Sequence, residues 1–187
     1  MSAAPLEQAV ASAKAVLAGV KPDQLGVSTP CASWKVSDLV NHMVGGQFWF
    51  ATVAKGETPG DDKAPDFSAG DFASTFAQAS AAAVAAFNAA GAMDKTMHLP
   101  WGDMKGSEFL GLASVDTFAH AWDLARATGQ NTDLNPELAA GLLVGARAGI
   151  PDQFRGADGV APFGAEQKAP AGACKADELA AFLGRII

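Results

Sequence analysis

The stretch SEFLGLASVDTFAHAWDLARATG, residues 107–129, decides the fold of this chain. Its apolar side chains recur at helical spacing from residue 107 to residue 128, which predicts one long helix. Gly129 follows directly, at the position where a glycine commonly ends a helix. Because most of one face of this helix is apolar, we expect that face to lie in the interior of a helical bundle.

Helical spacing of apolar residues also dominates the rest of the chain. It predicts further helices over residues 6–19, 36–53, 69–90, 136–149 and 175–185. Residues 58–66 are predicted as a loop, residues 97–104 as a short extended piece or hairpin, and residues 151–175 as irregular chain. The sequence therefore predicts an all-α protein, a four-helix bundle with additional short helices, forming one domain over residues 1–187.

The composition limits the kinds of molecule that this protein is expected to bind. The formal net charge is -7 and no run of Lys or Arg occurs, so we expect no binding to nucleic acid. No segment approaches the roughly 20 apolar residues of a membrane span, and the first residues lack the pattern of a signal peptide. We expect a cytoplasmic protein, monomeric or homodimeric, without a membrane partner. Cys31 and Cys174 are too few for a disulfide scaffold, and a single bridge between them is left open.

Polar residues inside the apolar pattern are the candidates for chemistry. Asp116 and His120 lie one helical turn apart on one face of the predicted helix 107–128, and His42 lies inside another apolar segment. A buried imidazole or carboxylate is costly unless a partner satisfies it. Two interpretations are open: these side chains are hydrogen-bonded core residues, which spacing alone favours, or they share a divalent metal between facing helices.

The metal interpretation has a definite chemistry. Imidazole and carboxylate ligands suit zinc, nickel, iron or manganese, and three protein ligands with an open position are typical of catalytic zinc. Gly45 and Gly46 follow His42 by one turn and would leave open volume beside its ring. Asp123, one turn beyond His120, either orients that imidazole or is an ordinary surface charge, and both interpretations stay open.

Three further residues have a functional and a structural interpretation. Cys31 precedes the predicted helix 36–53, where it is either a reactive thiolate or, as residue statistics favour, a small buried side chain. His98 is interpreted as an exposed loop histidine in preference to a residue at a pocket mouth. Trp34 either stacks on a ligand or packs in the core, and core packing explains it sufficiently.

Three linked motifs resemble one known family. They are TPCASWKVSDLVNH at residues 29–42, LPWGDM at residues 99–104 and DTFAHAWDLARATG at residues 116–129. The ending LAAFLGR, residues 179–185, is also similar to the usual end of this family. The chain thereby resembles the actinobacterial DinB-like metal-binding proteins related to the N-terminal domain of mycothiol-dependent maleylpyruvate isomerase.

The resemblance implies a DinB-like four-helix bundle with a metal site formed by His42, Asp116 and His120. It implies a divalent metal, zinc first and nickel or iron as alternatives, which activates mycothiol or a similar thiol toward a small electrophile in a transferase or isomerase reaction. Asp116 replaces the usual Glu of the family and is one methylene shorter. The alternative is a non-catalytic small-molecule-binding or sensing module with a degenerate metal site, and whether the chain turns over a substrate stays open.

Overall fold

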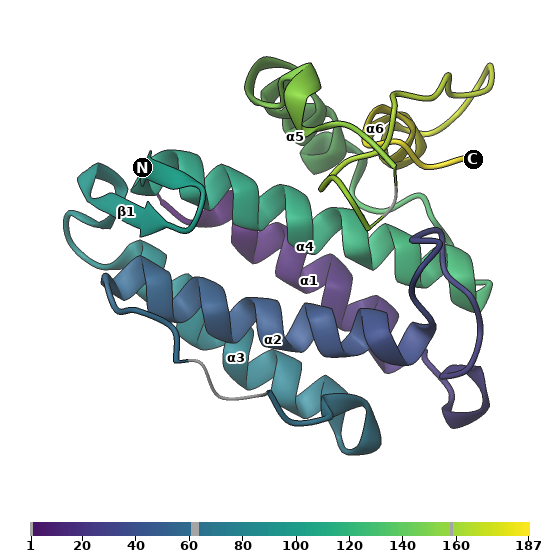
Figure 1. Ribbon diagram of the computed structural model, residues 1–187. Helices are drawn as coiled ribbons and strands as arrows, with labels where there is room; N and C mark the ends of the chain where they lie inside the picture. The colour runs from purple at the N-terminus through teal and green to yellow at the C-terminus, as the bar shows by residue number, and fades with distance from the viewer. Residues whose placement is uncertain (1, 61–63, 158) are drawn as a thin grey trace.

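The computed structural model describes residues 2–60, 64–157 and 159–187. These residues contain six α-helices and one two-stranded hairpin (Figure 1). The helices are α1 Ala4–Ala18, α2 Val36–Lys55, α3 Phe72–Asn88, α4 Gly106–Thr128, α5 Pro136–Gly149 and α6 Lys175–Phe182. The strands are β1 Thr96–Leu99 and β2 Gly102–Lys105, and short 3-10 helices cover Pro22–Gln24, Phe67–Ala69, Ala92–Asp94 and Asp152–Phe154. The prediction of an all-α bundle with short extra helices and a hairpin is confirmed.

The first four helices form the bundle. Helix α1 packs against α4, α2 packs against α3, and the two pairs meet through α1 with α3 and α2 with α4. Large side chains from all four helices are fully buried between them, among them Leu6, Leu39, Phe76 and Phe109. Removing this much apolar surface from water is the main stabilising contribution to the bundle.

Helix α4 is the centre of the molecule, because it is covered on two sides. Figure 1 shows α5 and α6 on the side of α4 that faces away from α2 and α3. A second apolar cluster joins α4 to these two helices, and it includes Phe118, Trp122, Leu142, Leu179 and Phe182. As a result, every residue from 117 to 125 is buried, and polar side chains in that stretch need partners inside the protein.

Local hydrogen bonds fix the ends of the site-bearing helices. Helix α2 begins where the Lys35 N–H donates to the Asp38 carboxylate (2.9 Å), and α4 begins where the Lys105 N–H donates to the Glu108 carboxylate (2.9 Å). Gly129 ends α4 with a positive φ of 70°, as its position in the sequence predicts.

Helix α3 is shorter than the predicted range 69–90. The Asp71 side chain accepts a hydrogen bond from the Ser74 N–H (3.0 Å) and so starts the helix at Phe72. At the other end, the Asn88 side chain is engaged by α1, since it accepts from the Ala3 N–H (2.9 Å) and donates to Glu7 (3.0 Å). Polar side chains therefore set both limits of a segment whose alanine content alone predicted a longer helix.

Residues 97–104 belong to an antiparallel hairpin, in which Met97 pairs with Met104 and His98 with Asp103. The His98 side chain is 80% exposed and its Nδ1 lies 2.8 Å from Oδ1 of Asp103. His98 is thus an exposed histidine, as the sequence favoured.

In the predicted loop 58–66, residues 61–63 lie outside the described residues. The single domain over residues 1–187 stays a prediction. No helix in the described part of the chain has the length and apolarity needed to cross a bilayer.

Candidate metal centre

The second turn of α2 and the middle turns of α4 bring His42, Asp116 and His120 together. Asp116 and His120 project from successive turns of α4, and His42 reaches them from α2. Oδ1 of Asp116 lies 3.3 Å from Nε2 of His42 and 3.5 Å from Nε2 of His120. The two imidazole rings meet edge to face, with 4.6 Å between their centroids. The structure thus places the three predicted ligand residues in one cluster.

The donor atoms of this cluster fit a divalent metal. One donor atom from each of the three residues lies within 4.8 Å of the others. A tetrahedral ion with bonds of 2.0–2.1 Å separates its ligand atoms by about 3.3–3.4 Å. The two distances from Asp116 Oδ1, 3.3 and 3.5 Å, are close to that separation. The separations of these two atom pairs are therefore compatible with a shared ion.

Asp123 fixes the orientation of His120. Its Oδ2 lies 3.0 Å from Nδ1 of His120, and the Asp123 side chain is fully buried. Because an ionised carboxylate only accepts hydrogen bonds, Nδ1 of His120 carries the proton of the neutral ring. Nε2 then presents its lone pair toward Asp116 and His42, which is the arrangement that a metal-binding imidazole requires.

Charges within the cluster act against the cost of burial. Burial disfavours the charged form of His42, but its hydrogen bond with Asp116 and the negative charge of that carboxylate raise the pKa of His42 above its ordinary value. Burial raises the pKa of Asp116, yet His120 and His42 outweigh it and hold the pKa below the usual range. Asp116 is thus an anion between two imidazoles.

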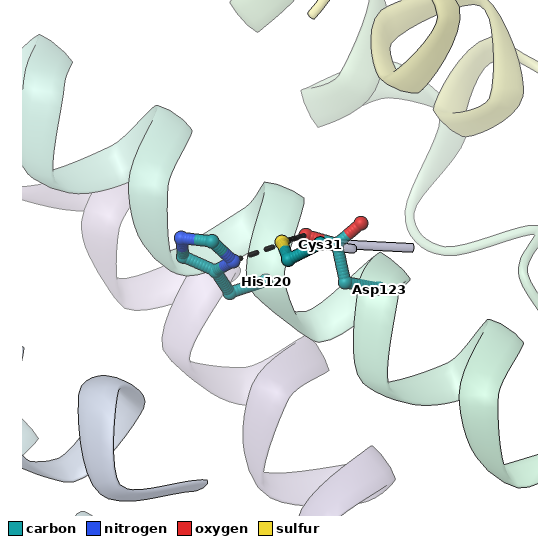
Figure 2. Close-up of side chains that lie close together, drawn as sticks. All are labelled: Cys31, His120 and Asp123. Atoms are coloured by element: carbon teal, nitrogen blue, oxygen red, sulfur yellow. Dashed lines mark hydrogen bonds and ion pairs between the residues drawn. The ribbon is translucent and has the colours of Figure 1, made fainter. Parts of the chain in front are cut away.

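A second cluster, formed by Cys31, His120, Asp123 and Arg185, adjoins the first. Figure 2 shows the imidazole of His120 facing the carboxylate of Asp123, with the sulfur of Cys31 beside it. The Cys31 thiol donates to Oδ2 of Asp123 (3.4 Å). Arg185 donates from Nε to Oδ1 (3.1 Å) and from Nη2 to Oδ2 (2.8 Å) of Asp123. Arg185 also donates from Nη2 to Sγ of Cys31, at 3.7 Å.

The two clusters differ in their suitability for a cation. Cys31, His120 and Asp123 also have donor atoms within 4.8 Å of one another. However, Arg185 contacts both oxygens of Asp123, so this carboxylate already has its positive partner. Burial raises the pKa of Asp123, but Arg185 and the hydrogen bond with His120 hold it far below the usual range. Asp116 has no arginine within ion-pair distance in the described chain, so the cluster of His42, Asp116 and His120 is the better cation site.

The surroundings leave one side of the predicted ligands accessible. The side chains of His42, Asp116 and His120 are 35%, 24% and 11% exposed. Trp34 covers both imidazoles, with its ring centroid 4.7 Å from His42 and 5.6 Å from His120. A Cβ added at Gly46 would lie 3.8 Å from the Phe50 ring and 3.9 Å from Oδ2 of Asp116, both ordinary contact distances, while one added at Gly45 would lie 3.7 Å from Phe67.

Sequence reasoning missed part of this arrangement. It did not single out Arg185, which lies 62 positions from Asp123. Arg185 belongs to the stretch 179–185, which resembles the usual end of the family. Trp34 packs against the core, as the sequence favoured, and it also contacts His42. The contact of Cys31 with Asp123 was not foreseen, and its predicted lack of reactivity stays a prediction. Both cysteines are thiols, and Cys174 lies at the start of α6, where its sulfur accepts from the Asp177 N–H (3.5 Å).

A helical bundle that carries two histidines and a carboxylate on facing helices defines a class of candidate metal-binding proteins. The comparisons with known proteins give the family. The model of the mycothiol maleylpyruvate isomerase N-terminal domain matches residues 6–125, and the chain belongs to that family. Residues beyond 125, including Arg185, lie outside the matched part.

The relatives found are mycobacterial. Two uncharacterized proteins of Mycobacterium tuberculosis, from strains CDC 1551 / Oshkosh and H37Rv, are each 44% identical to this chain over 177 residues. The similarity covers 92% of this chain and 91% of each relative. No solved structure gave a significant match.

Proposed function

We propose that the chain binds a divalent metal through His42, Asp116 and His120 and presents a low-molecular-weight thiol to a small electrophile. Zinc is the metal we propose, and nickel or iron are the alternatives that the same donor set accepts. Mycothiol is the thiol we propose, because the family takes its name from a mycothiol-dependent isomerase. The reaction class is a transfer or an isomerisation.

The position of Asp116 is the observation that carries the proposal. One oxygen of this carboxylate lies 3.3 and 3.5 Å from the Nε2 atoms of two histidines on two helices. A neutral His120 with its proton on Nδ1 has no hydrogen on Nε2 to donate, so His42 is the only one of the two histidines that can donate a hydrogen bond to Asp116. The second imidazole has its Nδ1 engaged by Asp123, and its Nε2 also faces the carboxylate. A shared cation accounts for all three donor atoms at once.

The other residues of the site have separate tasks. Asp123 holds the proton of His120 on Nδ1 and keeps Nε2 directed at Asp116. Trp34 packs its ring against both imidazoles. The partial exposure of His42 and Asp116 leaves a side from which a small thiol reaches the donor atoms.

When bound, a divalent metal lowers the pKa of a coordinated thiol so that the sulfur is a thiolate at neutral pH. Arg185 is engaged by Asp123 and is therefore not available to the proposed thiol, so Asp116 and His42 border the thiol position that we propose.

The test uses cobalt as a spectroscopic substitute for zinc. We expect the purified chain, loaded with Co²⁺, to gain an intense near-ultraviolet absorption when mycothiol is added, because a thiolate bonded to cobalt absorbs there. The His120→Ala variant treated in the same way should show no such band. A chain that binds cobalt but gives no band with mycothiol would contradict thiol activation and support the non-catalytic binding module.

Replacement of Asp116 by Glu, the carboxylate that is usual in the family, tests the role of Asp116. We expect Asp116→Glu to retain one equivalent of zinc with equal or tighter affinity, since the carboxylate is kept and reaches one methylene further. Asp116→Asn, the matched isostere without charge, should weaken zinc binding by more than the roughly 10–100-fold that contacts behind a ligand contribute. Affinities come from competition with a chromophoric chelator. A large loss in Asp116→Glu, together with little effect in Asp116→Asn, would show that Asp116 is not a ligand.

A further inference from the structure

Arg185 forms the strongest polar contact behind the proposed metal site. Its guanidinium meets both oxygens of Asp123 in a two-pronged contact of 3.1 and 2.8 Å. The Asp123 side chain is 0% exposed and that of Arg185 only 12%. Two-pronged pairs of this kind are directional as well as strong, so they fix where the carboxylate points. The oxygen that accepts the shorter of these bonds is also the one that faces Nδ1 of His120.

The C-terminal segment is built to deliver this arginine. Helix α6 packs on α4 through Leu179 and Phe182, and it ends three residues before Arg185. Gly184 then turns the chain with a φ of 98°, and a Cβ there would lie 2.5 Å from Cα of Gly164. Only glycine fits both the conformation and the close approach. The turn brings Arg185 back along α6, where its N–H donates to the Ala180 carbonyl (2.9 Å).

All three guanidinium nitrogens of Arg185 donate within the protein, in four hydrogen bonds. Nε and Nη2 donate to Asp123, Nη2 also donates to Cys31, and Nη1 donates to the carbonyl of Leu183 (3.1 Å). A substrate-binding arginine would direct its Nη atoms at the accessible side instead. The contacts of Arg185 therefore act on Asp123 and, through it, on His120.

We infer that Arg185 is a positioning residue for the metal site: the C-terminal segment, outside the part that the family model matches, locks Asp123 and thereby the ring of His120. The consequence for metal binding rests on the proposed function. The consequence for the His120 ring does not, since it follows from the contacts alone. The site is thus completed by residues about 60 positions beyond the end of the matched domain.

The experiment compares two buried arginines of the same segment in the full chain. Arg155 is the matched control, because its side chain is 11% exposed and donates from Nη1 to the carbonyls of Phe182 (2.8 Å) and Gly164 (3.0 Å) without touching Asp123. Arg185→Met should weaken zinc binding by about 10–100-fold, and Arg155→Met should leave it within about twofold of wild type. Arg185→Lys keeps the charge but loses the two-pronged geometry, so its affinity should be intermediate.

Nitrogen-15 NMR of the metal-free chain gives a second readout, which a merely structural role of Arg185 would not change. At alkaline pH the wild type should show the proton of His120 on Nδ1, and Arg185→Met should show a mixture of tautomers. If Arg185→Met does not fold, Arg185→Lys must show both weaker zinc binding and a mixture of His120 tautomers, each to a smaller extent. Equal losses of affinity in the Arg155 and Arg185 variants, or an unchanged His120 tautomer, would overturn the inference. Absence of zinc from the wild type would overturn the proposed function. In that case the His120 tautomer in the wild type and in Arg185→Met would be the only measurement that decides the role of Arg185.

Discussion

Asp123→Ala is expected to lower the free energy of unfolding by about 3–5 kcal/mol, because it leaves a buried arginine without its counter-charge. Asp123 is fully buried and receives hydrogen bonds from His120, Cys31 and Arg185. Removing the carboxylate leaves several buried hydrogen-bond donors without an acceptor, and each such donor then carries its full desolvation cost. Chemical denaturation followed by far-ultraviolet circular dichroism measures the change.

The chain offers a matched control for this prediction. Asp103 pairs with His98 at 2.8 Å, much as Asp123 pairs with His120 at 3.0 Å, but its side chain is 65% exposed. Asp103→Ala should cost less than about 1 kcal/mol, because water replaces the partner of an exposed pair. Similar losses in the two variants would show that burial of the Asp123 cluster does not have the energetic role assigned to it.

His42→Ala is expected to abolish stoichiometric metal binding, which is the largest functional effect predicted for a single substitution. Two donor atoms remain, and both come from neighbouring turns of α4, so an ion would lose its attachment to α2. His98→Ala is the control, since that imidazole lies exposed on the hairpin and pairs only with Asp103 among the described residues. Zinc titration of both apo-variants, followed by chelator competition, measures the difference. Retention of tight, stoichiometric zinc by His42→Ala would place the ion elsewhere.

The arrangement of helices was largely predictable, because it follows from hydrophobic spacing. The exact ends were not, since they depend on side chains that serve as caps or join other helices. Asp71 and Asn88 shorten α3 in this way, and Gly184 ends the last helix before Arg185. A helical pattern reports which face is buried, but it does not report where a polar side chain captures a backbone group.

The site was predictable only for residues that share a helix or a recognisable motif. Asp116 and His120 are four positions apart, so their common face follows from helix geometry. His42 was a candidate partner because it lies inside another apolar helix, and the resemblance strengthened that assignment. Cys31 and Arg185 meet Asp123 across 92 and 62 positions, and no local pattern encodes such contacts. The buried stretch 117–125 does contain a signal: three polar side chains, Thr117, His120 and Asp123, without a solvent face to explain them.

Elemental analysis is the most direct test of the proposed metal site. The full chain and its His120→Ala variant are purified without a metal-affinity column and measured for zinc, nickel and iron. About one equivalent of a single divalent metal in the wild type, and none in His120→Ala, is the result that the account predicts. No metal in the wild type after reconstitution, or equal metal in both proteins, would contradict it.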